Sequence, residues 1–206
     1  MVEQAWRPLS VDEAAAVFAP LGCAWWIAGG WAIDLHVGRE TRAHGDMDIA
    51  LLRRDCGRVA ELLGDWDVQI AHDGELRPWD AEPLPVDRHQ FWARRRGHEA
   101  WAFEVLLEET SDDAWVYRRD GRVTLPLAEI GHVLPDGVPY LRPGVALLYK
   151  SPPGPDMERN SRNNMDFEAV VGSLPDADRR WLRAALGLTA PGHRWIAALN
   201  AAGAGW

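Results

Sequence analysis

Cysteine and long apolar runs are both scarce in this chain. Cys23 and Cys56 are the only cysteines among 206 residues, which is too few for a disulfide framework, and no Cys/His spacing resembles a zinc site. No stretch reaches the roughly 18 uninterrupted apolar residues that a membrane span needs. The first twenty residues lack the basic start and apolar core of a signal peptide. We therefore expect a soluble, cytoplasmic protein with no membrane partner.

Positive charge is also in short supply. Acidic residues outnumber basic ones 31 to 22, the net charge is -9, and Lys150 is the only lysine. Broad nucleic-acid binding needs positive charge to displace counterions from phosphates, so the composition argues against a nucleic-acid partner. The acidic excess suits a cationic partner, or carboxylates gathered around a divalent metal. Apolar residues at 47% and charged residues at 26% are typical of a folded protein.

The hydrophobic pattern divides the chain into an α/β part and a helical part. Strands are expected at residues 24–28, 46–52, 66–71, 90–93 and 100–107, with short edge strands at 115–117 and 122–125. Helices are expected at 10–18, 31–37, 55–63, 143–150, 160–171, 175–186 and 193–200. Ser10 and Glu13 form a capping box for the first helix, and 73–86, rich in Pro, Gly and charge, is expected to be a loop. We expect an α/β domain over 1–135 and a C-terminal helical subdomain over 136–206.

Three acidic residues fall on predicted strands. Residues two apart on a strand point to the same face, with Cα atoms roughly 7 Å apart, so Asp46 and Asp48 are expected to project together. Two neighbouring carboxylates repel unless a positive group lies between them, and paired oxygen ligands suit magnesium. Glu104 stands among apolar neighbours, where an unpaired carboxylate is costly to bury. Together the three acids predict a site for two metal ions.

Other interpretations of these residues stay open. An Asp-x-Asp pair alone usually marks a turn or a solvated surface. Glu104 can instead be an ion-pair partner of an arginine in the expected turn at 94–96. Glu108 and Glu109 are rival third ligands, but they begin the run at 108–113, which is expected to be a solvated loop. The twelve tryptophans are expected mostly in the core, with Trp79 and Trp92 as candidates for an acceptor pocket.

A glycine pair precedes the two aspartates. Gly29-Gly30 lies between a predicted strand and a predicted helix. Glycine lets the backbone approach a phosphate closely, and a helix start offers free N–H groups and the positive end of a dipole. The pair is weak evidence alone, but with the helix and the Asp-x-Asp strand that follow it the composite is strong.

These motifs resemble the nucleotidyltransferases of the DNA polymerase beta superfamily, most closely the small branch that modifies aminoglycosides and lincosamides. The matching residues are Gly29-Gly30-Trp31-Ala32-Ile33-Asp34, Arg42, His44 and Asp46-Met47-Asp48-Ile49. A weaker match covers 140–150 and 164–167. The chain departs from the family at Glu104, which is often aspartate there, and at Asn163-Asn164, where Lys-Asp is common.

The resemblance implies an α+β fold, with a polymerase-beta-type core of mixed sheet and flanking helices. It implies transfer of a nucleoside monophosphate, with AMP as the favoured group, from a nucleoside triphosphate to a hydroxyl of a small molecule that is aminoglycoside- or lincosamide-like, with release of pyrophosphate. Asp46 and Asp48 would hold two Mg²⁺ ions, and Glu104 would help hold one and accept the proton. Gly29 and Gly30 would cradle the triphosphate, and Arg42 and Lys150 would neutralise its charge.

Several roles and two other functions stay open at this point. His44 can simply tie a loop, Lys150 can complement a helix dipole, and Asp166 is expected to cap or pair within the helical part. The oligomeric state is open between monomer and homodimer. One alternative is a non-catalytic relative of antitoxin type that binds nucleotide or a partner protein. The other is a glycosyltransferase that uses Asp-x-Asp to hold a nucleotide-sugar.

Overall fold

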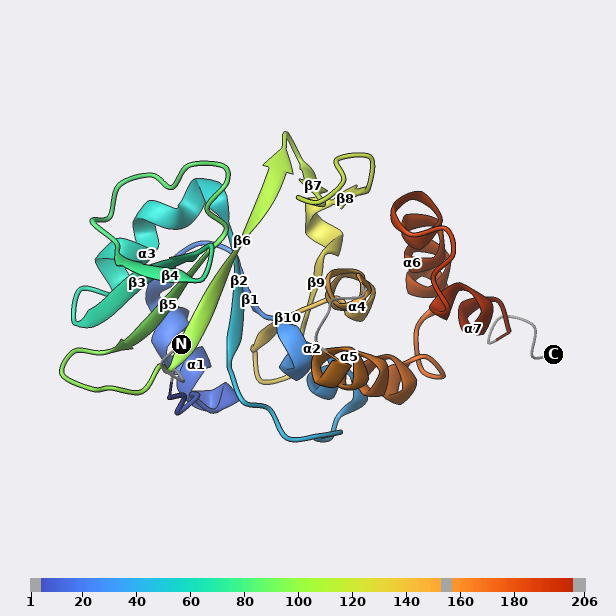
Figure 1. Ribbon diagram of the computed structural model, residues 1–206, viewed down its shortest axis with the longest axis horizontal. Coiled ribbons are helices and arrows are strands. Elements are labelled where there is room, and N and C mark those ends of the chain that lie inside the picture. Colours follow the sequence, from blue (N-terminus) through green and yellow to red (C-terminus); the bar gives the residue numbers. More distant parts are fainter. Residues whose placement is uncertain (1–4, 153–156, 202–206) are drawn as a thin grey trace.

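A mixed β-sheet runs through the centre of the protein. The computed structural model describes residues 5–152 and 157–201. Its strands follow the order β4-β3-β5-β6-β2-β1-β10-β9. Outside this order, β7 pairs with β6, and β8 pairs with β7. Helices α1 and α3 lie on one side, α2, α4 and α5 on the other, and α6 and α7 lie outermost (Figure 1). This confirms the expected mixed sheet with flanking helices and a helical C-terminal part.

The elements have the following bounds. The strands are β1 Trp25–Ile27, β2 Asp48–Leu52, β3 Trp66–His72, β4 Glu75–Pro78, β5 Gln90–Arg95, β6 Phe103–Ser111, β7 Ala114–Val116, β8 Thr124–Pro126, β9 Gly131–Val133 and β10 Pro139–Leu141. The helices are α1 Val11–Phe18, α2 Gly29–Val37, α3 Cys56–Leu62, α4 Pro143–Lys150, α5 Met157–Val170, α6 Asp176–Thr189 and α7 Trp195–Ala201.

Side chains along β2 alternate between two hydrophobic cores, one on each face of the sheet. Ile49 and Leu51 pack with α1 and α3, whereas Ala50 and Leu52 pack with α4 to α7. Successive strand residues point to opposite faces, so Asp48 shares the face of Ala50 and Leu52. The first polar residue of β2 therefore faces the C-terminal helices.

The second core also crosses the expected domain boundary. It contains Trp26 of β1 together with Leu147 of α4, Leu182 of α6 and Trp195 of α7, all nearly inaccessible to solvent. The division into 1–135 and 136–206 stays a prediction. What the structure adds is that the two parts share one hydrophobic core.

One local expectation is confirmed and three others need correction. The capping box is confirmed, because Ser10 Oγ accepts from Glu13 N and Glu13 Oε2 accepts from Ser10 N. The loop expected at 73–86 is wrong in part, since β4 forms a hairpin with β3 around Asp73 and Gly74, both with positive φ. The short strands β9 and β10 were not expected at all; β10 lies parallel to β1. The strand expected from residue 46 begins only at Asp48.

The run at 108–113 is only in part the solvated loop that its charge predicts: Asp112 and Asp113 form an exposed turn, but the run begins inside a strand. Glu108 is only 2% exposed and lies in β6. Its Oε2 accepts from Trp115 Nε1 at 2.6 Å and from Tyr149 Oη at 2.7 Å. Burial raises the pKa of Glu108, and the two hydrogen bonds oppose that rise. Glu108 therefore links the β6–β7 hairpin to α4.

Candidate active site

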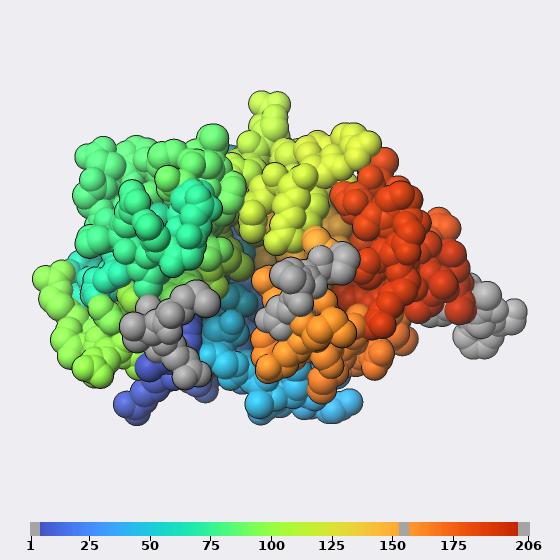
Figure 2. Space-filling model, in the orientation of Figure 1, coloured from blue at the N-terminus to red at the C-terminus, as the bar shows by residue number. Residues whose placement is uncertain are grey.

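Two carboxylates and an indole stand side by side on three neighbouring strands. Asp48 of β2 is the direct partner of Glu104 in the parallel β2–β6 ladder. Glu104 is in turn opposite Trp92 in the antiparallel β5–β6 ladder. Directly opposite residues have Cβ atoms about 5 Å apart, so these three side chains share one face of the sheet. In the space-filling view the segment near residues 40–50 lies between the lobe of β3–β5 at left and the C-terminal helices at right (Figure 2).

Both carboxyls of this pair hold their protons more tightly than usual. Burial, followed by the charge of Asp46, raises the pKa of Asp48 to about 6. Burial and the charge of Asp48 raise the pKa of Glu104 well above its ordinary value. The indole N–H of Trp92, next to Glu104 on the sheet, opposes that rise. A cation bound between two carboxylates held this close together would stabilise their charged forms.

Asp46 does not complete a three-carboxylate cluster. It lies exposed in the turn before β2, where its backbone oxygen accepts from Trp31 Nε1 at 3.2 Å. Within residues 5–152 and 157–201, no three His, Cys, Asp or Glu side chains are close enough together to hold a metal ion. The donor chemistry still fits magnesium, because Asp48 and Glu104 are carboxylate oxygen ligands held side by side on neighbouring strands.

The arginines at 94–96 do not compensate Glu104. Arg94 Nε donates to Asp67 at 2.8 Å, and its guanidinium lies 4.4 Å from the centre of the Trp101 ring. The other tryptophan considered for an acceptor pocket, Trp79, stacks on Phe91 in the core of the opposite face. Of the two tryptophans, only Trp92 therefore lies beside the carboxylate pair.

Gly29 and Gly30 leave room for side chains of this protein to pack directly against the backbone at the start of α2. Gly29 has a φ of +60°, and a Cβ there would lie 2.8 Å from Cγ of Asp48 and collide with its Oδ2. At Gly30 a Cβ would collide with the imidazole of His44 and lie 2.6 Å from Arg42 Nη2. The helix α2 begins at Gly29, and the strand before it pairs with β2. The glycine pair thus lets Asp48, His44 and Arg42 gather at the start of α2.

A buried pair holds the loop between α2 and β2. His44 Nε2 lies 2.6 Å from Asp34 Oδ2, and the two side chains are 1% and 3% exposed. The other oxygen of Asp34 accepts from Thr41 N at 3.1 Å and from the Thr41 hydroxyl. The Trp31 ring lies 4.5 Å from that of His44. His44 therefore ties the loop, and Asp34, which the sequence offered only as the last residue of a motif, is its anchor.

Asp166 joins the two parts of the chain. Arg42 donates to both of its oxygens, from Nε at 2.7 Å and from Nη2 at 2.9 Å. Lys150 Nζ lies 2.8 Å from Oδ2. Asp166 was expected to pair within the helical part; it does so with Lys150, and it also reaches Arg42 on the far side of the sequence. Two cations on one carboxylate leave a net positive charge next to the start of α2.

The arrangement combines a carboxylate pair, a helix start and two anchored cations. Carboxylates can hold divalent cations and accept a proton. Helix N-termini and cations bind phosphate oxygens. Figure 1 shows three helices on one side of β2: α2, which begins at Gly29, α4, which ends at Lys150, and α5, which carries Asp166. A fold and a set of side chains of this kind suit a nucleotidyltransferase.

The family follows from comparison with known proteins. Residues 10–125, more than half of the chain, match the model of the family described as aminoglycoside-2''-adenylyltransferase. The chain belongs to this family. Curated relatives described as 2''-aminoglycoside nucleotidyltransferase, from Escherichia coli and Klebsiella pneumoniae, are 45% identical over 42 residues. That alignment covers 19% of this chain and 24% of each relative, so the chain spans about a quarter of the length of the curated relatives that it matches.

Solved structures support the same fold. The crystal structure of ANT(2'')-Ia in complex with adenylyl-2''-tobramycin aligns with 87% of this chain and 97% of its own, at a TM-score of 0.60 and 18% identity. The lincomycin-bound lincosamide adenylyltransferase LnuA aligns with 79% of this chain and 99% of its own, at a TM-score of 0.53 and 12% identity.

In the part of the chain that the structure describes, no helix combines the length and the apolar character needed to cross a membrane.

Proposed function

We propose that this protein transfers a nucleoside monophosphate, AMP in the first instance, from a nucleoside triphosphate to a hydroxyl of a small molecule resembling an aminoglycoside or a lincosamide, with release of pyrophosphate. The observation that carries the proposal is the Asp48–Glu104 pair beside Gly29, at the start of α2. Family membership and the relatives named for aminoglycoside transfer support it. A protein with an acidic surface, net charge -9, also suits a cationic acceptor.

Each side chain has a definite part in this proposal. Asp48 and Glu104 would hold magnesium, and Asp46, which lies outside the pair but whose charge already acts on Asp48, would join them as the third ligand for two ions. The bound ions would supply positive charge to the reacting phosphate. Glu104 accepts the proton of the acceptor hydroxyl, a role that suits a carboxyl whose pKa is raised by burial. The N–H groups at Gly29 and Gly30 orient the phosphates.

The cations Arg42 and Lys150 balance the phosphate charge. Asp166 fixes both of them, so they need little reorganisation when the substrate arrives. A preorganised pair of this kind stabilises charge more effectively than two mobile side chains do.

The test is mass spectrometry of an antibiotic and metabolite panel incubated with ATP, GTP and Mg²⁺. A mass gain of one nucleoside monophosphate identifies donor and acceptor together. Asp48→Asn is expected to abolish the gain while the unfolding midpoint stays at or above that of the wild type. The matched control is Asp12→Asn, an exposed aspartate in the first turn of α1, which should retain full activity. Undiminished turnover by the Asp48 variant would remove the proposed mechanism.

The non-catalytic alternative makes a different prediction in the same assay. A relative that only binds nucleotide or a partner protein gives no mass gain with any acceptor and no pyrophosphate from ATP. A glycosyltransferase instead consumes a sugar nucleotide in preference to a triphosphate. Pyrophosphate release that depends on Mg²⁺ and on the acceptor excludes both.

A further inference from the structure

Asp46 is the least constrained of the three candidate metal ligands. It lies exposed in the turn before β2, whereas Asp48 and Glu104 are paired on neighbouring strands. Burial is the largest cause of the raised pKa of Asp48, and the charge of Asp46 is the next, so the Asp46 carboxylate acts on the pair without belonging to it. A bound ion can recruit Asp46 only if the backbone of the turn holds its side chain on the same face of the sheet.

Met47 fastens that backbone on one side of Asp46. Its side chain is fully buried in the core with α1 and α3, and its backbone oxygen accepts from Glu104 N at 2.8 Å. Successive residues of an extended chain point to opposite faces, so burial of Met47 favours the face of Asp48 for Asp46. On the other side Gly45 is exposed, and no described atom lies within 4 Å of a Cβ placed there. Packing therefore supports the turn after Asp46 but not before it.

The indole of Trp31 supplies a second fastening. From the first turn of α2, its Nε1 donates to Asp46 O at 3.2 Å. The Trp31 ring lies 4.5 Å from the ring of His44, which the buried Asp34 holds at 2.6 Å. Trp31 and Asp34 are three residues apart and so lie on the same face of α2. One face of this helix therefore holds the turn at both His44 and Asp46.

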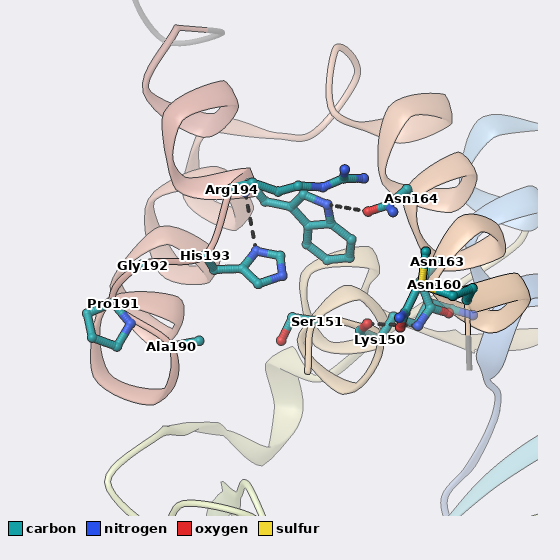
Figure 3. Close-up of a pocket in the computed structure, with 12 residues that line it drawn as sticks. Lys150, Ser151, Asn160, Asn163, Asn164, Ala190, Pro191, Gly192, His193 and Arg194 are labelled. Atoms are coloured by element: carbon teal, nitrogen blue, oxygen red, sulfur yellow. Dashed lines mark hydrogen bonds between the residues drawn. The ribbon is translucent and has the colours of Figure 1, made fainter. Parts of the chain in front are cut away.

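Indole N–H groups also hold the chain elsewhere in this protein. Trp181 Nε1 donates to Thr124 O at 3.1 Å, and Trp195 Nε1 donates to Asn164 Oδ1 at 3.1 Å (Figure 3). Neither acceptor is a candidate metal ligand or a sequence neighbour of one. Trp31 differs from these two because its acceptor is the backbone of a candidate ligand.

We propose that Trp31 is a positioning residue, whose indole N–H holds the backbone of Asp46 so that the carboxylate joins Asp48 and Glu104 when a divalent cation binds. The inference rests on the proposed function and adds the residue that lets an exposed aspartate serve as the third ligand. Ordering a backbone costs conformational entropy, and a tether that exists before the ion arrives removes part of that cost from the binding step. Loss of the tether should therefore weaken metal binding without changing the charge of the site.

Binding of Mn²⁺ alone, without nucleotide, tests this inference without using activity. The free ion is measured by its electron paramagnetic resonance signal as metal is added to the protein. Trp31→Phe keeps an aromatic ring beside His44 and removes the N–H. Its matched control is Trp181→Phe in α6, which also removes an indole bond to a backbone oxygen, of nearly the same length.

The expected result is a selective loss of metal affinity. Trp31→Phe should weaken Mn²⁺ binding about fivefold, equivalent to about 1 kcal/mol, and Trp181→Phe should leave it unchanged. Asp46→Asn should weaken it as well. Adding Trp31→Phe to Asp46→Asn should cause no further loss, because the tether acts only through Asp46.

A second substitution removes the donor and preserves the shape of the ring. Benzothienylalanine in place of Trp31 has sulfur where the indole has N–H, so the fold is retained and the same fivefold loss is expected, about 1 kcal/mol. Unchanged Mn²⁺ affinity in this protein would overturn the inference whatever Trp31→Phe does to folding.

The other outcomes separate this inference from the proposed function. Wild-type affinity in both Trp31 variants, with weakened binding in Asp46→Asn, would overturn the positioning role and leave the proposed function standing. A further loss when Trp31→Phe is added to Asp46→Asn would also overturn it, because Trp31 would then act through another group. If the wild type binds no Mn²⁺, the inference fails together with the metal sites of the proposed function.

Discussion

The bridge of Asp166 to Arg42 and Lys150 makes a quantitative prediction about stability. The Asp166 carboxylate is fully buried, and the side chains of Arg42 and Lys150 are only 13% and 14% exposed. Replacing Asp166 with asparagine removes the negative charge but nearly preserves the volume. Two largely buried cations then lie close together without the carboxylate that neutralises them.

The expected loss is about 3 kcal/mol in the free energy of unfolding. Removing one partner from a buried ion pair costs roughly 3–5 kcal/mol. The low end applies because both cations keep some contact with water. With a urea m-value of about 2 kcal/mol/M, the unfolding midpoint should fall by about 1.5 M.

Urea unfolding followed by tryptophan fluorescence measures this loss, because the chain has twelve tryptophans. The matched control is Glu158→Gln on the same helix. Glu158 pairs with Arg162 at 2.8 Å, but the two side chains are 80% and 46% exposed, and exposed pairs of this kind contribute about 0.3–0.5 kcal/mol. Equal losses in the two variants would refute the reasoning that the Asp166 bridge is a buried link between the two parts of the chain.

The pH dependence of the same difference has a definite sign. Burial raises the pKa of Asp166, but hydrogen bonds from Arg42 and the charge of Lys150 outweigh burial and leave the pKa below its ordinary value. The advantage over the asparagine variant is therefore complete above the ordinary aspartate pKa of about 3.9. It is lost as the pH falls through the lower pKa of the folded state. Urea titrations at pH 7 and at successively lower pH should show the gap closing only below about pH 4.

Three further substitutions give results that can be checked directly. Gly29→Ala places a Cβ against the Asp48 carboxylate at a positive φ, so steady-state assays should show a loss of turnover of about a hundredfold or more, with a destabilisation of about 1–2 kcal/mol. Asp48→Asn removes the repulsion with Glu104 and should raise the thermal unfolding midpoint in EDTA; a lower midpoint would show that the pair is not repulsive. Glu108→Gln keeps an acceptor for its two donors and should cost under about 1 kcal/mol, whereas Glu108→Ala leaves both unsatisfied and should cost more than about 2 kcal/mol in urea unfolding.

Local sequence signals predict the elements that depend on neighbouring residues. Ser10 and Glu13 define the start of α1, because the capping bonds lie within four residues of each other. The Asp73-Gly74 turn was also a readable hairpin signal, but the Pro and charge around it favoured a loop. The short strands β9 and β10 carry no local signal, since they are strands only through pairing with β1 and with each other.

The candidate site divides in the same way. Asp48, Glu104 and the glycine pair were predictable from spacing, because a strand and a helix start impose their geometry on neighbouring residues. The register that sets Asp48 against Glu104 is a long-range fact. The burial of Glu108 by Trp115 and Tyr149 was not predictable, since charge in a short run is usually solvated.

Asp166 shows why the helical part cannot be understood separately from the site. Its three contacts to Arg42 and Lys150 hold two phosphate-binding candidates in place, and one of them comes from the loop that precedes Asp48. Asp166 lies on α5, Lys150 ends α4 and Arg42 lies in the loop between α2 and β2, so a shift of α5 would move both cations. The buried carboxylate is therefore a link between the helical part and the loop that leads into Asp48.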